Sequence, residues 1–336
     1  MHISVLITCY NLEKYISLAI RSALDQDYDR HKYEIIVVDD CSSDCSAEII
    51  KSYDSVKYVR TDNNKGVLCA TILGMQHATG EIIAFLDGDD IWRNDKLSNI
   101  ATKFNYDNSL IFLTHNYRFI NDEGDYITGT EYTQNVYSEV TEDAEISKLI
   151  REGILHRKNY VWLGSAYSIK LKKEDINAFM SWINKLPNPQ LTYQDWPLAF
   201  WIAASCEGRF GYDNEQLFFY RIHTANYSGD SNSLQKAIGN WSKAYNTSAC
   251  LLEIANKFSC EESVKTVCRM AVESDEIVLS LFQKQKRFFI FHYITKWRSF
   301  GSFGNWIKEV LRMLAIKIFG FRFYFFLKKR IALYNK

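Results

Sequence analysis

The first hundred residues contain short segments that are too uniformly apolar to form half-exposed strands. Residues 3–8 read ISVLIT, residues 34–38 read EIIVV, and residues 82–86 read IIAFL. A strand with almost no polar alternation must be covered on both faces. A helical stripe follows the first strand, with apolar side chains spaced i, i+3, i+4, i+7 and i+8 from residue 12 to residue 24. Such alternation predicts an α/β fold, with a mostly parallel, Rossmann-like sheet flanked by helices.

Beyond residue 110 the pattern changes to a mixture of strands and helices. We expect strands over 110–120, 160–169 and 216–222, and a helix over 195–204. Residues 231–285 have the apolar spacing of helices. The sequence therefore predicts a first domain over residues 1–230, divided near 105, followed by a helical extension over 231–285 and a distinct segment over 286–336.

Acidic residues follow two of the apolar strands directly. Asp87, Asp89 and Asp90 end the strand at 82–86, and Asp39 and Asp40 end the strand at 34–38. Carboxyl ends of parallel strands share one edge of a sheet, where ligands bind. Crowded carboxylates raise one another's pKa and destabilise a fold unless a cation offsets them. Mg²⁺ or Mn²⁺ would do so, because hard cations prefer oxygen ligands and share them with substrate phosphates.

A simpler interpretation of the same acidic residues also exists. Asp-Gly favours a turn, and Asp90 could cap the helix that follows. Asp39 and Asp40 could likewise only start a turn. The glycine-rich patterns G-x-G-x-x-G and G-x-x-x-x-G-K-[ST] are absent, so a bound diphosphate would need a metal to meet its charge. Cys41 and Cys45 lack the partners of a metal site.

Taken together, these motifs resemble the inverting nucleotide-sugar glycosyltransferases of family 2, which have the GT-A fold. ISVLITCYNLEKYISLAIRSAL is similar to that family's first strand and helix, and EIIVVDDCSSD to its nucleotide-binding strand end. The stretch from NNKG through ATGEIIAFLDGDDIW is similar to the segment that leads into its D-x-D motif. The match covers residues 3–97 and is weaker after them, so the resemblance concerns the nucleotide-binding half, residues 1–105, more than the acceptor half, residues 106–230.

The resemblance implies roles for the residues at these strand ends. The base and ribose of a nucleotide would be lined by Thr8, Tyr10 and Asp39, with Asp40 nearby. Asp87 would approach the ribose or the metal. Asp89 would bind the cation, Mn²⁺ or Mg²⁺, that holds the sugar diphosphate.

Two downstream motifs complete the resemblance. The sequence YQDW at 193–196 is similar to the acceptor-side acidic motif, and Asp195 would then be the general base. The alternative is that Asp195 only caps a helix. YRIHTAN at 220–226 is similar to a late motif whose histidine, His223, can reach the metal, although a lone histidine is as often an ordinary hydrogen-bonded residue.

Five positions depart from the family pattern. Thr71 and Ile72 replace Arg and Asn, Gln194 replaces Glu, Asn94 replaces Pro, and Cys41 replaces Gly. The first two bring the diphosphate contact from that helix into question, and Cys41 does the same for the turn geometry.

The last segment differs from the rest of the chain in charge. Residues 286–336 hold 12 Lys and Arg and one acid, Glu309, so this tail carries +11 and the preceding body −11. Basic residues interleaved with aromatics favour attachment to an anionic membrane surface. The alternatives are a helix pair with a solvated basic face, or nucleic-acid binding, which the acidic body disfavours. We expect no transmembrane helix and no signal peptide, and so a cytoplasmic protein peripheral on the inner face of the cell membrane.

These features predict an inverting glycosyltransferase. It would move a sugar from a nucleotide-diphosphate donor, preferably a UDP-sugar, to a saccharide acceptor in cell-surface polysaccharide or glycan biosynthesis. A lipid-linked acceptor would explain the tail. A carboxylate can remove the acceptor's proton, and a metal can neutralise the departing diphosphate. The alternatives are a non-catalytic nucleotide-sugar-binding scaffold and a nucleotidyltransferase.

Overall fold

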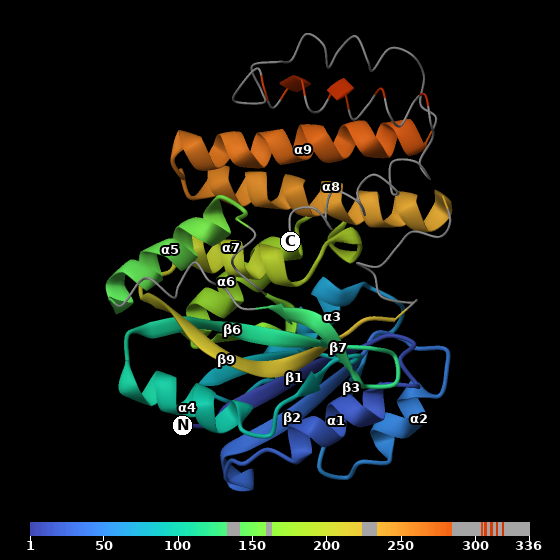
Figure 1. Ribbon diagram of the computed structural model, residues 1–336, viewed down its shortest axis with the longest axis vertical. Coiled ribbons are helices and arrows are strands. Elements are labelled where there is room, and N and C mark those ends of the chain that lie inside the picture. Colours follow the sequence, from blue (N-terminus) through green and yellow to red (C-terminus); the bar gives the residue numbers. More distant parts are fainter. Residues whose placement is uncertain are drawn as a thin grey trace. The chain divides into compact units, whose positions relative to one another are not determined.

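The computed structural model describes residues 1–132, 142–158, 163–223 and 234–283, and seven single positions between 304 and 318. The chain forms two compact units, Met1–His223 and Thr224–Lys336 (Figure 1). The divisions expected at 105, 230 and 285 remain predictions. Most of the basic tail and residues 224–226 of the late motif lie outside the described residues.

The described strands of the first unit form one sheet with the order β3-β2-β1-β4-β8-β6-β9-β5, and β7 pairs with β6 (Figure 1). Their bounds are β1 Ile3–Cys9, β2 Tyr33–Asp39, β3 Lys57–Arg60, β4 Ile82–Asp87, β5 Ile91–Trp92, β6 Leu110–Ile120, β7 Tyr126–Tyr132, β8 Ser168–Ile169 and β9 Arg209–Arg221. The four strands β3, β2, β1 and β4 are parallel. Beyond β4 the sheet is mixed, because β8 is antiparallel to both of its neighbours while β6 and β9 are parallel.

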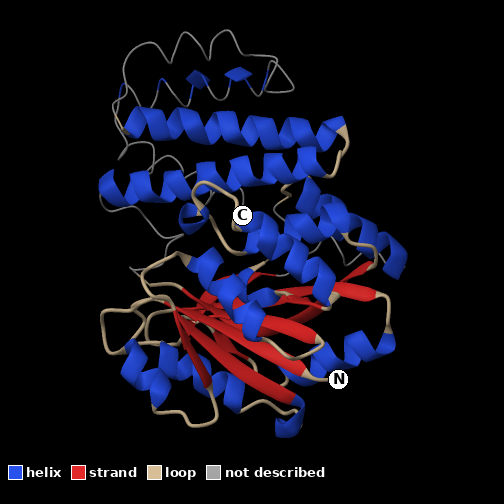
Figure 2. Ribbon diagram, turned by 180° about the vertical axis from the view of Figure 1, so that it is seen from behind, coloured by secondary structure: helices blue, strands red, loops and turns tan. Residues whose placement is uncertain are grey.

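Helices cover both faces of this sheet (Figure 2). They are α1 Ile16–Leu24, α2 Ser46–Lys51, α3 Val67–His77, α4 Lys96–Tyr106, α5 Asp143–Leu155, α6 Lys173–Ile183 and α7 Asp195–Ser205. Strand β2 shows why its sequence is apolar throughout. Ile35 and Val37 pack into the core cluster that contains α1 and α4, whereas Ile36 and Val38 pack against Ala70 of α3. The expected α/β sheet with helices on both faces is therefore confirmed.

The second unit is helical in its described part. It contains α8 Leu234–Lys257 and α9 Glu262–Phe282, which pack through Ala237 and Val278. Trp306 and Val310 of the tail pack against Ile277 of α9. No helix among the described residues is long and apolar enough to cross a membrane.

The strand expected over 160–169 is wrong in its described part. A 3-10 turn, η3 Gly164–Ala166, occupies the middle, and only β8 is extended. Gly164 has a φ of +65°, a left-handed conformation that a regular strand cannot contain. Residues 159–162 lie outside the described residues.

Candidate functional site

The register of the parallel strands brings the predicted residues to one edge of the sheet. Thr8 lies opposite Asp87 of β4, and Cys9 lies opposite Asp39 of β2. The Gly88 N–H donates to the Thr8 carbonyl at 3.0 Å, and a Cβ on Gly88 would lie 2.7 Å from that oxygen. The ends of β1 and β4 therefore touch, and only glycine fits between them. Tyr10 follows β1 and is 46% exposed.

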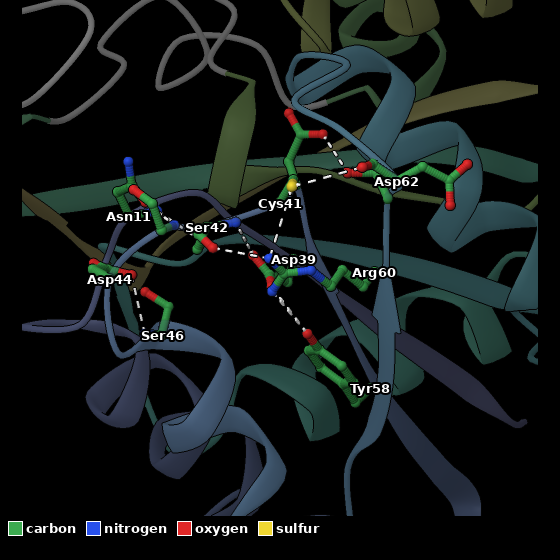
Figure 3. A network of polar contacts seen from close by, with 12 residues as sticks. Asn11, Asp39, Cys41, Ser42, Asp44, Ser46, Tyr58, Arg60 and Asp62 are labelled. Atoms are coloured by element: carbon green, nitrogen blue, oxygen red, sulfur yellow. Dashed lines mark hydrogen bonds and ion pairs between the residues drawn. The ribbon is translucent and has the colours of Figure 1, made fainter.

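Asp39 is completely buried and surrounded by donors (Figure 3). Its Oδ1 accepts from the Ser42 N–H at 2.8 Å, and its Oδ2 accepts from Arg60 Nη1 at 2.5 Å and from the Tyr58 hydroxyl at 3.0 Å. Arg60 also donates to the Ser42 carbonyl, and its side chain is 37% exposed. Arg60 is thus the outer member of the pair, and sequence reasoning missed it.

The loops after β1 and β2 interlock beside this pair (Figure 3). Asn11 donates its N–H to Ser42 Oγ at 2.9 Å and accepts from the Ser43 N–H at 2.8 Å. Cys41 has a φ of +62°, the left-handed conformation that the family's glycine adopts easily. The left-handed conformation costs the cysteine about 1–2 kcal/mol relative to a glycine.

Asp40 faces a different part of the molecule from Asp39. Its Oδ1 accepts from Thr61 Oγ1 and from the Lys65 N–H, both at 2.9 Å, and its Oδ2 accepts from the Gly66 N–H at 2.7 Å. Because the carboxylate is only 3% exposed, these bonds fix the loop that leads into α3.

Each aspartate of the D-x-D stretch has its own partner. Asp87 Oδ1 accepts from Gln194 Nε2 at 2.5 Å, and Asp89 Oδ2 lies 3.1 Å from His223 Nε2. Asp90 is 1% exposed and accepts from the Ser165 hydroxyl at 2.6 Å and from the Arg221 N–H at 3.0 Å. Asp90 does not cap the next helix, because α4 begins at Lys96, six residues later, and its capping position is Asp95.

Burial and mutual repulsion shift the pKa values of these carboxyls. Burial, followed by the charges of Asp89 and Asp195, raises the pKa of Asp87 to about 7, although the hydrogen bond from Gln194 opposes the shift. Burial and the charges of Asp89 and Asp87 also raise the pKa of Asp90 well above its usual range. The Lys96 side chain is 0% exposed and donates to the Ser165 carbonyl. Burial lowers the pKa of Lys96 well below its usual range, and the charges of Asp90 and Asp87 oppose this shift.

Asp89 and His223 form the pair that could hold a metal. The His223 side chain is 2% exposed and that of Asp89 is 21% exposed, so the imidazole is fixed while the carboxylate reaches the surface. Imidazole and carboxylate together suit Mn²⁺, and carboxylate alone suits Mg²⁺. Among the described ranges, no group of three or more His, Cys, Asp or Glu is arranged to hold a metal. The pair fits a cation whose other ligands come from a substrate and water.

Asp195 is the first residue of α7, so the capping position belongs to Gln194, and the expected alternative role as a cap is wrong. Its Oδ1 accepts from the adjacent Trp196 N–H at 2.8 Å. Burial raises the pKa of this carboxyl, and the backbone N–H donors at the helix start oppose the shift. The negative charge of Asp195 also contributes to the raised pKa of Asp87, which places the two carboxyls in one electrostatic environment.

Sequence reasoning missed several side chains that hold these residues. Ser165 bonds the Asp87 N–H and the Asp90 carboxyl at once, and Arg221 donates its Nε to the Asp89 carbonyl at 2.9 Å. Thr71 and Gln194, noted above only as departures, contact each other through Thr71 Oγ1 and Gln194 Oε1 at 2.8 Å. In the sequence, the only indication of this contact was that both positions depart from the family pattern.

Comparisons with known proteins agree with this geometry. Residues 4–168 match the profile of glycosyl transferase family 2. An uncharacterized glycosyltransferase of Haemophilus influenzae is 33% identical over 176 residues, which are 48% of this chain and 69% of that protein. The Escherichia coli protein WfgD, named UDP-Glc:alpha-D-GlcNAc-diphosphoundecaprenol beta-1,3-glucosyltransferase, is 33% identical over 138 residues, which are 40% of this chain and 53% of WfgD.

Two solved structures share the fold along almost the whole chain. Residues 1–349 of Staphylococcus aureus TarS, solved with UDP-GlcNAc, have a TM-score of 0.55 at 17% identity, over 94% of this chain and 91% of that fragment. The mannosyltransferase PcManGT of Pyrobaculum calidifontis, solved with GDP-Man and Mn²⁺, has a TM-score of 0.52 at 14% identity and covers 95% of this chain and 86% of its own.

Proposed function

Since the chain belongs to glycosyl transferase family 2, we propose that it moves one sugar from a nucleotide-diphosphate donor to a saccharide acceptor, with inversion at the anomeric carbon. The enzyme class and the GT-A fold with a helical C-terminal region are confirmed by the family and its structural neighbours. The donor, the acceptor and the residue roles below belong to the proposal.

The observation that carries the proposal is the contact between Asp89 and His223, which lie 134 residues apart in the chain and meet at 3.1 Å. The two residues come from the D-x-D stretch and from the end of β9, and they meet at the sheet edge that also holds Thr8, Asp39 and Asp87. A bound Mn²⁺ or Mg²⁺ would supply positive charge to the donor diphosphate. Asp89 and His223 are the residues that would hold it.

The other residues have separate tasks in this proposal. Thr8 and Tyr10 line the pocket of the base and ribose, Asp39 supports it from its buried position with Asp40 nearby, and Asp87 lies against the ribose or the metal. Asp195 takes the proton of the acceptor hydroxyl as that oxygen bonds to the anomeric carbon, and the bond from that carbon to the diphosphate breaks. The burial that raises the pKa of Asp195 makes it a stronger base than an exposed aspartate. The nucleoside diphosphate leaves with the bonding electron pair.

A UDP-sugar is the preferred donor and a lipid-linked saccharide the preferred acceptor. WfgD is named for both, and the TarS structure holds UDP-GlcNAc. The structure of PcManGT contains GDP-Man. GDP is therefore the nucleotide to compare with UDP in binding experiments. The relatives' names support a role in cell-surface polysaccharide biosynthesis. The basic tail would place the enzyme on the inner face of the cell membrane, beside such an acceptor.

The first test is calorimetric titration of UDP and of GDP, with Mn²⁺ and with EDTA. We expect UDP to bind in the presence of Mn²⁺ and to lose most of its affinity in EDTA and in Asp89→Ala. The matched control is Asp54→Ala, since Asp54 is an exposed aspartate just after α2 and outside the D-x-D stretch. Binding that is indifferent to metal and to Asp89 would contradict the proposed site.

The second test separates binding from chemistry. Asp195→Asn should bind UDP and Mn²⁺ like the wild type but lose transfer from UDP-glucose to GlcNAc-diphospho-undecaprenol by about 100-fold or more. Retained transfer would remove Asp195 from the mechanism. Release of inorganic diphosphate in place of UDP would indicate a nucleotidyltransferase.

A further inference from the structure

Gln194 joins three elements that are distant in the sequence. Its side-chain oxygen accepts from Thr71 Oγ1 of α3 at 2.8 Å, and its Nε2 donates to Asp87 Oδ1 at the end of β4 at 2.5 Å. Gln194 itself directly precedes α7. Gln194 is 8% exposed and Thr71 is 1% exposed, so water does not compete freely for either bond.

The amide group is the chemical requirement of this bridge. Its Nε2 donates to Asp87 Oδ1 and its Oε1 accepts from the Thr71 hydroxyl, so one group serves as donor and acceptor at once. A carboxylate in place of the amide would only accept, and it would face Asp87 oxygen to oxygen. The Thr71 hydroxyl has one proton and two acceptors within reach, Gln194 Oε1 at 2.8 Å and the Val67 carbonyl one helical turn back at 2.9 Å. The second contact places the Thr71 oxygen, and the two acceptors share the proton.

The opposite side of Asp87 is closed as well. A Cβ on Gly164 would lie 3.3 Å from Asp87 Oδ2, and the Asp87 N–H donates to Ser165 Oγ at 2.9 Å. The carboxyl group is therefore bounded on one side by Gly164 at the start of η3 and hydrogen-bonded on the other side by Gln194. Since Asp195 is the next residue after Gln194, the same bridge fixes the start of α7.

We propose that Gln194 is a positioning residue, held by Thr71, that fixes the Asp87 carboxyl group for the donor and sets its placement relative to Asp195. The inference rests on the proposed transferase function. Under this inference, Asp87 on the donor side and Asp195 on the acceptor side are joined through Gln194. A shift of one would therefore displace the other.

The test compares variants in transfer from UDP-glucose to GlcNAc-diphospho-undecaprenol, with kcat and the KM values of donor and acceptor measured separately. Gln194→Glu keeps the shape and removes the donor, and we expect kcat to fall about 100-fold, as for a displaced catalytic group. Thr71→Val removes the hydroxyl that orients the amide, and kcat should fall about tenfold. Thr71→Ser restores that hydroxyl and should recover most of the loss. The KM for the acceptor should stay within about threefold of the wild type.

The matched control is Thr102→Val. Thr102 lies on α4 and bonds the Ser98 carbonyl one turn back at 2.8 Å, as Thr71 does with Val67, but it is exposed and contacts no site residue in the described structure. Thr102→Val should transfer like the wild type. Melting temperatures of all variants show which are folded.

The outcomes separate this inference from the proposed function. If the wild type transfers sugar and folded Gln194→Glu is equally active, the positioning role is overturned while the transferase function stands. The same holds if Thr71→Ser is as impaired as Thr71→Val, because the hydroxyl is then irrelevant. If the wild type neither transfers sugar nor binds UDP, the proposed function fails and the inference falls with it.

Discussion

At the scale of single residues, the D-x-D stretch divides its charges among different neighbours. Asp90 is buried and accepts hydrogen bonds from Ser165 and Arg221. Asp87 accepts a hydrogen bond from Gln194, and the partly exposed Asp89 lies beside His223. The protein thus keeps three carboxyls at one strand end by burying one, bridging one and leaving one partly exposed. This arrangement stores unfavourable electrostatic energy at the site.

That energy should appear as a pH dependence of stability. The pKa of Asp87 is raised from 3.8 to about 7, so the folded protein holds this proton more tightly than the unfolded chain. The free energy of unfolding of the donor-free protein in EDTA should therefore fall as pH rises from about 4 to about 7. Asp87→Asn should be more stable than the wild type at pH 8, by roughly 1–2 kcal/mol, in urea denaturation.

The control for this prediction has the opposite sign. A hydrogen bond from Ser109 lowers the pKa of Asp107, so its stabilising contribution is present at neutral pH and is lost as pH falls below the ordinary aspartate range. Asp107→Asn should therefore be less stable than the wild type at pH 8. A wild type more stable than Asp87→Asn at pH 8 would contradict the stored repulsion.

The sequence predicted the residue types at the sheet edge but not their partners. Asp39 and Asp87 could be placed because strand ends in a parallel sheet share an edge. The contact of Thr71 with Gln194 could not, since it depends on where α7 starts relative to α3, 123 residues earlier in the chain. Arg60 was missed for a similar reason: it ends β3, and only the pairing of β3 with β2 brings it to Asp39.

At the scale of elements, the parallel half of the sheet was predicted well and the mixed half less well. The three segments expected from their apolar sequence are strands that bury side chains on both faces of the sheet. Each lies entirely within a strand of the structure: residues 3–8 in β1, 34–38 in β2 and 82–86 in β4. Helix α1 begins at Ile16 rather than at Leu12 because residues 12–15 form a turn on the Leu12 carbonyl. Strand β5 has two residues and no periodicity to detect. Strand β9 begins at Arg209, seven residues before the expected start, since its first half pairs with β6 rather than following an apolar pattern.

The loop between β3 and α3 yields a prediction about one glycine. Gly66 has a φ of +81°, and a Cβ there would lie 2.2 Å from the Gln190 carbonyl oxygen, part of the backbone near the start of α7. Gly66→Ala should lower the free energy of unfolding by roughly 3 kcal/mol or more, measured by urea denaturation. Gly239→Ala on α8 meets nothing within 4 Å and should instead stabilise the protein by about 0.5–1 kcal/mol. Equal effects of the two changes would refute the close approach.

At the scale of the whole molecule, charge and apolar surface are gathered in the tail. Trp306 and Val310 pack on α9, whereas Ile307, Leu311, Leu314 and Ile318 are 37%, 59%, 42% and 66% exposed. The apolar side chains described in this segment are thus of two kinds, two that pack against α9 and four that are exposed. An exposed apolar row within a segment of charge +11 has the chemistry of an anionic lipid surface.

We expect the full chain to sediment with vesicles of phosphatidylcholine mixed with phosphatidylglycerol, and not with phosphatidylcholine alone. High salt should weaken this binding because the tail's charges are screened. Replacing Leu311 and Ile318 by Ser should weaken it at least tenfold. The control is Tyr106→Ser, an 86% exposed aromatic residue on α4. Binding that Tyr106→Ser weakens as much as the tail variant, or no binding by a folded full chain, would contradict membrane attachment through the tail.

The contacts that complete the site all reach far forward along the chain. Gln194 meets Asp87 across 107 residues, Arg221 meets Asp90 across 131, and His223, the last residue of the first unit, meets Asp89 across 134. During synthesis the D-x-D stretch therefore leaves the ribosome long before its partners do. The carboxyl groups of that stretch therefore lack these hydrogen-bonding partners until β9 has been synthesised. A nascent chain can acquire its donor site only when the first unit is nearly finished, so ligand capture would report the completion of that unit.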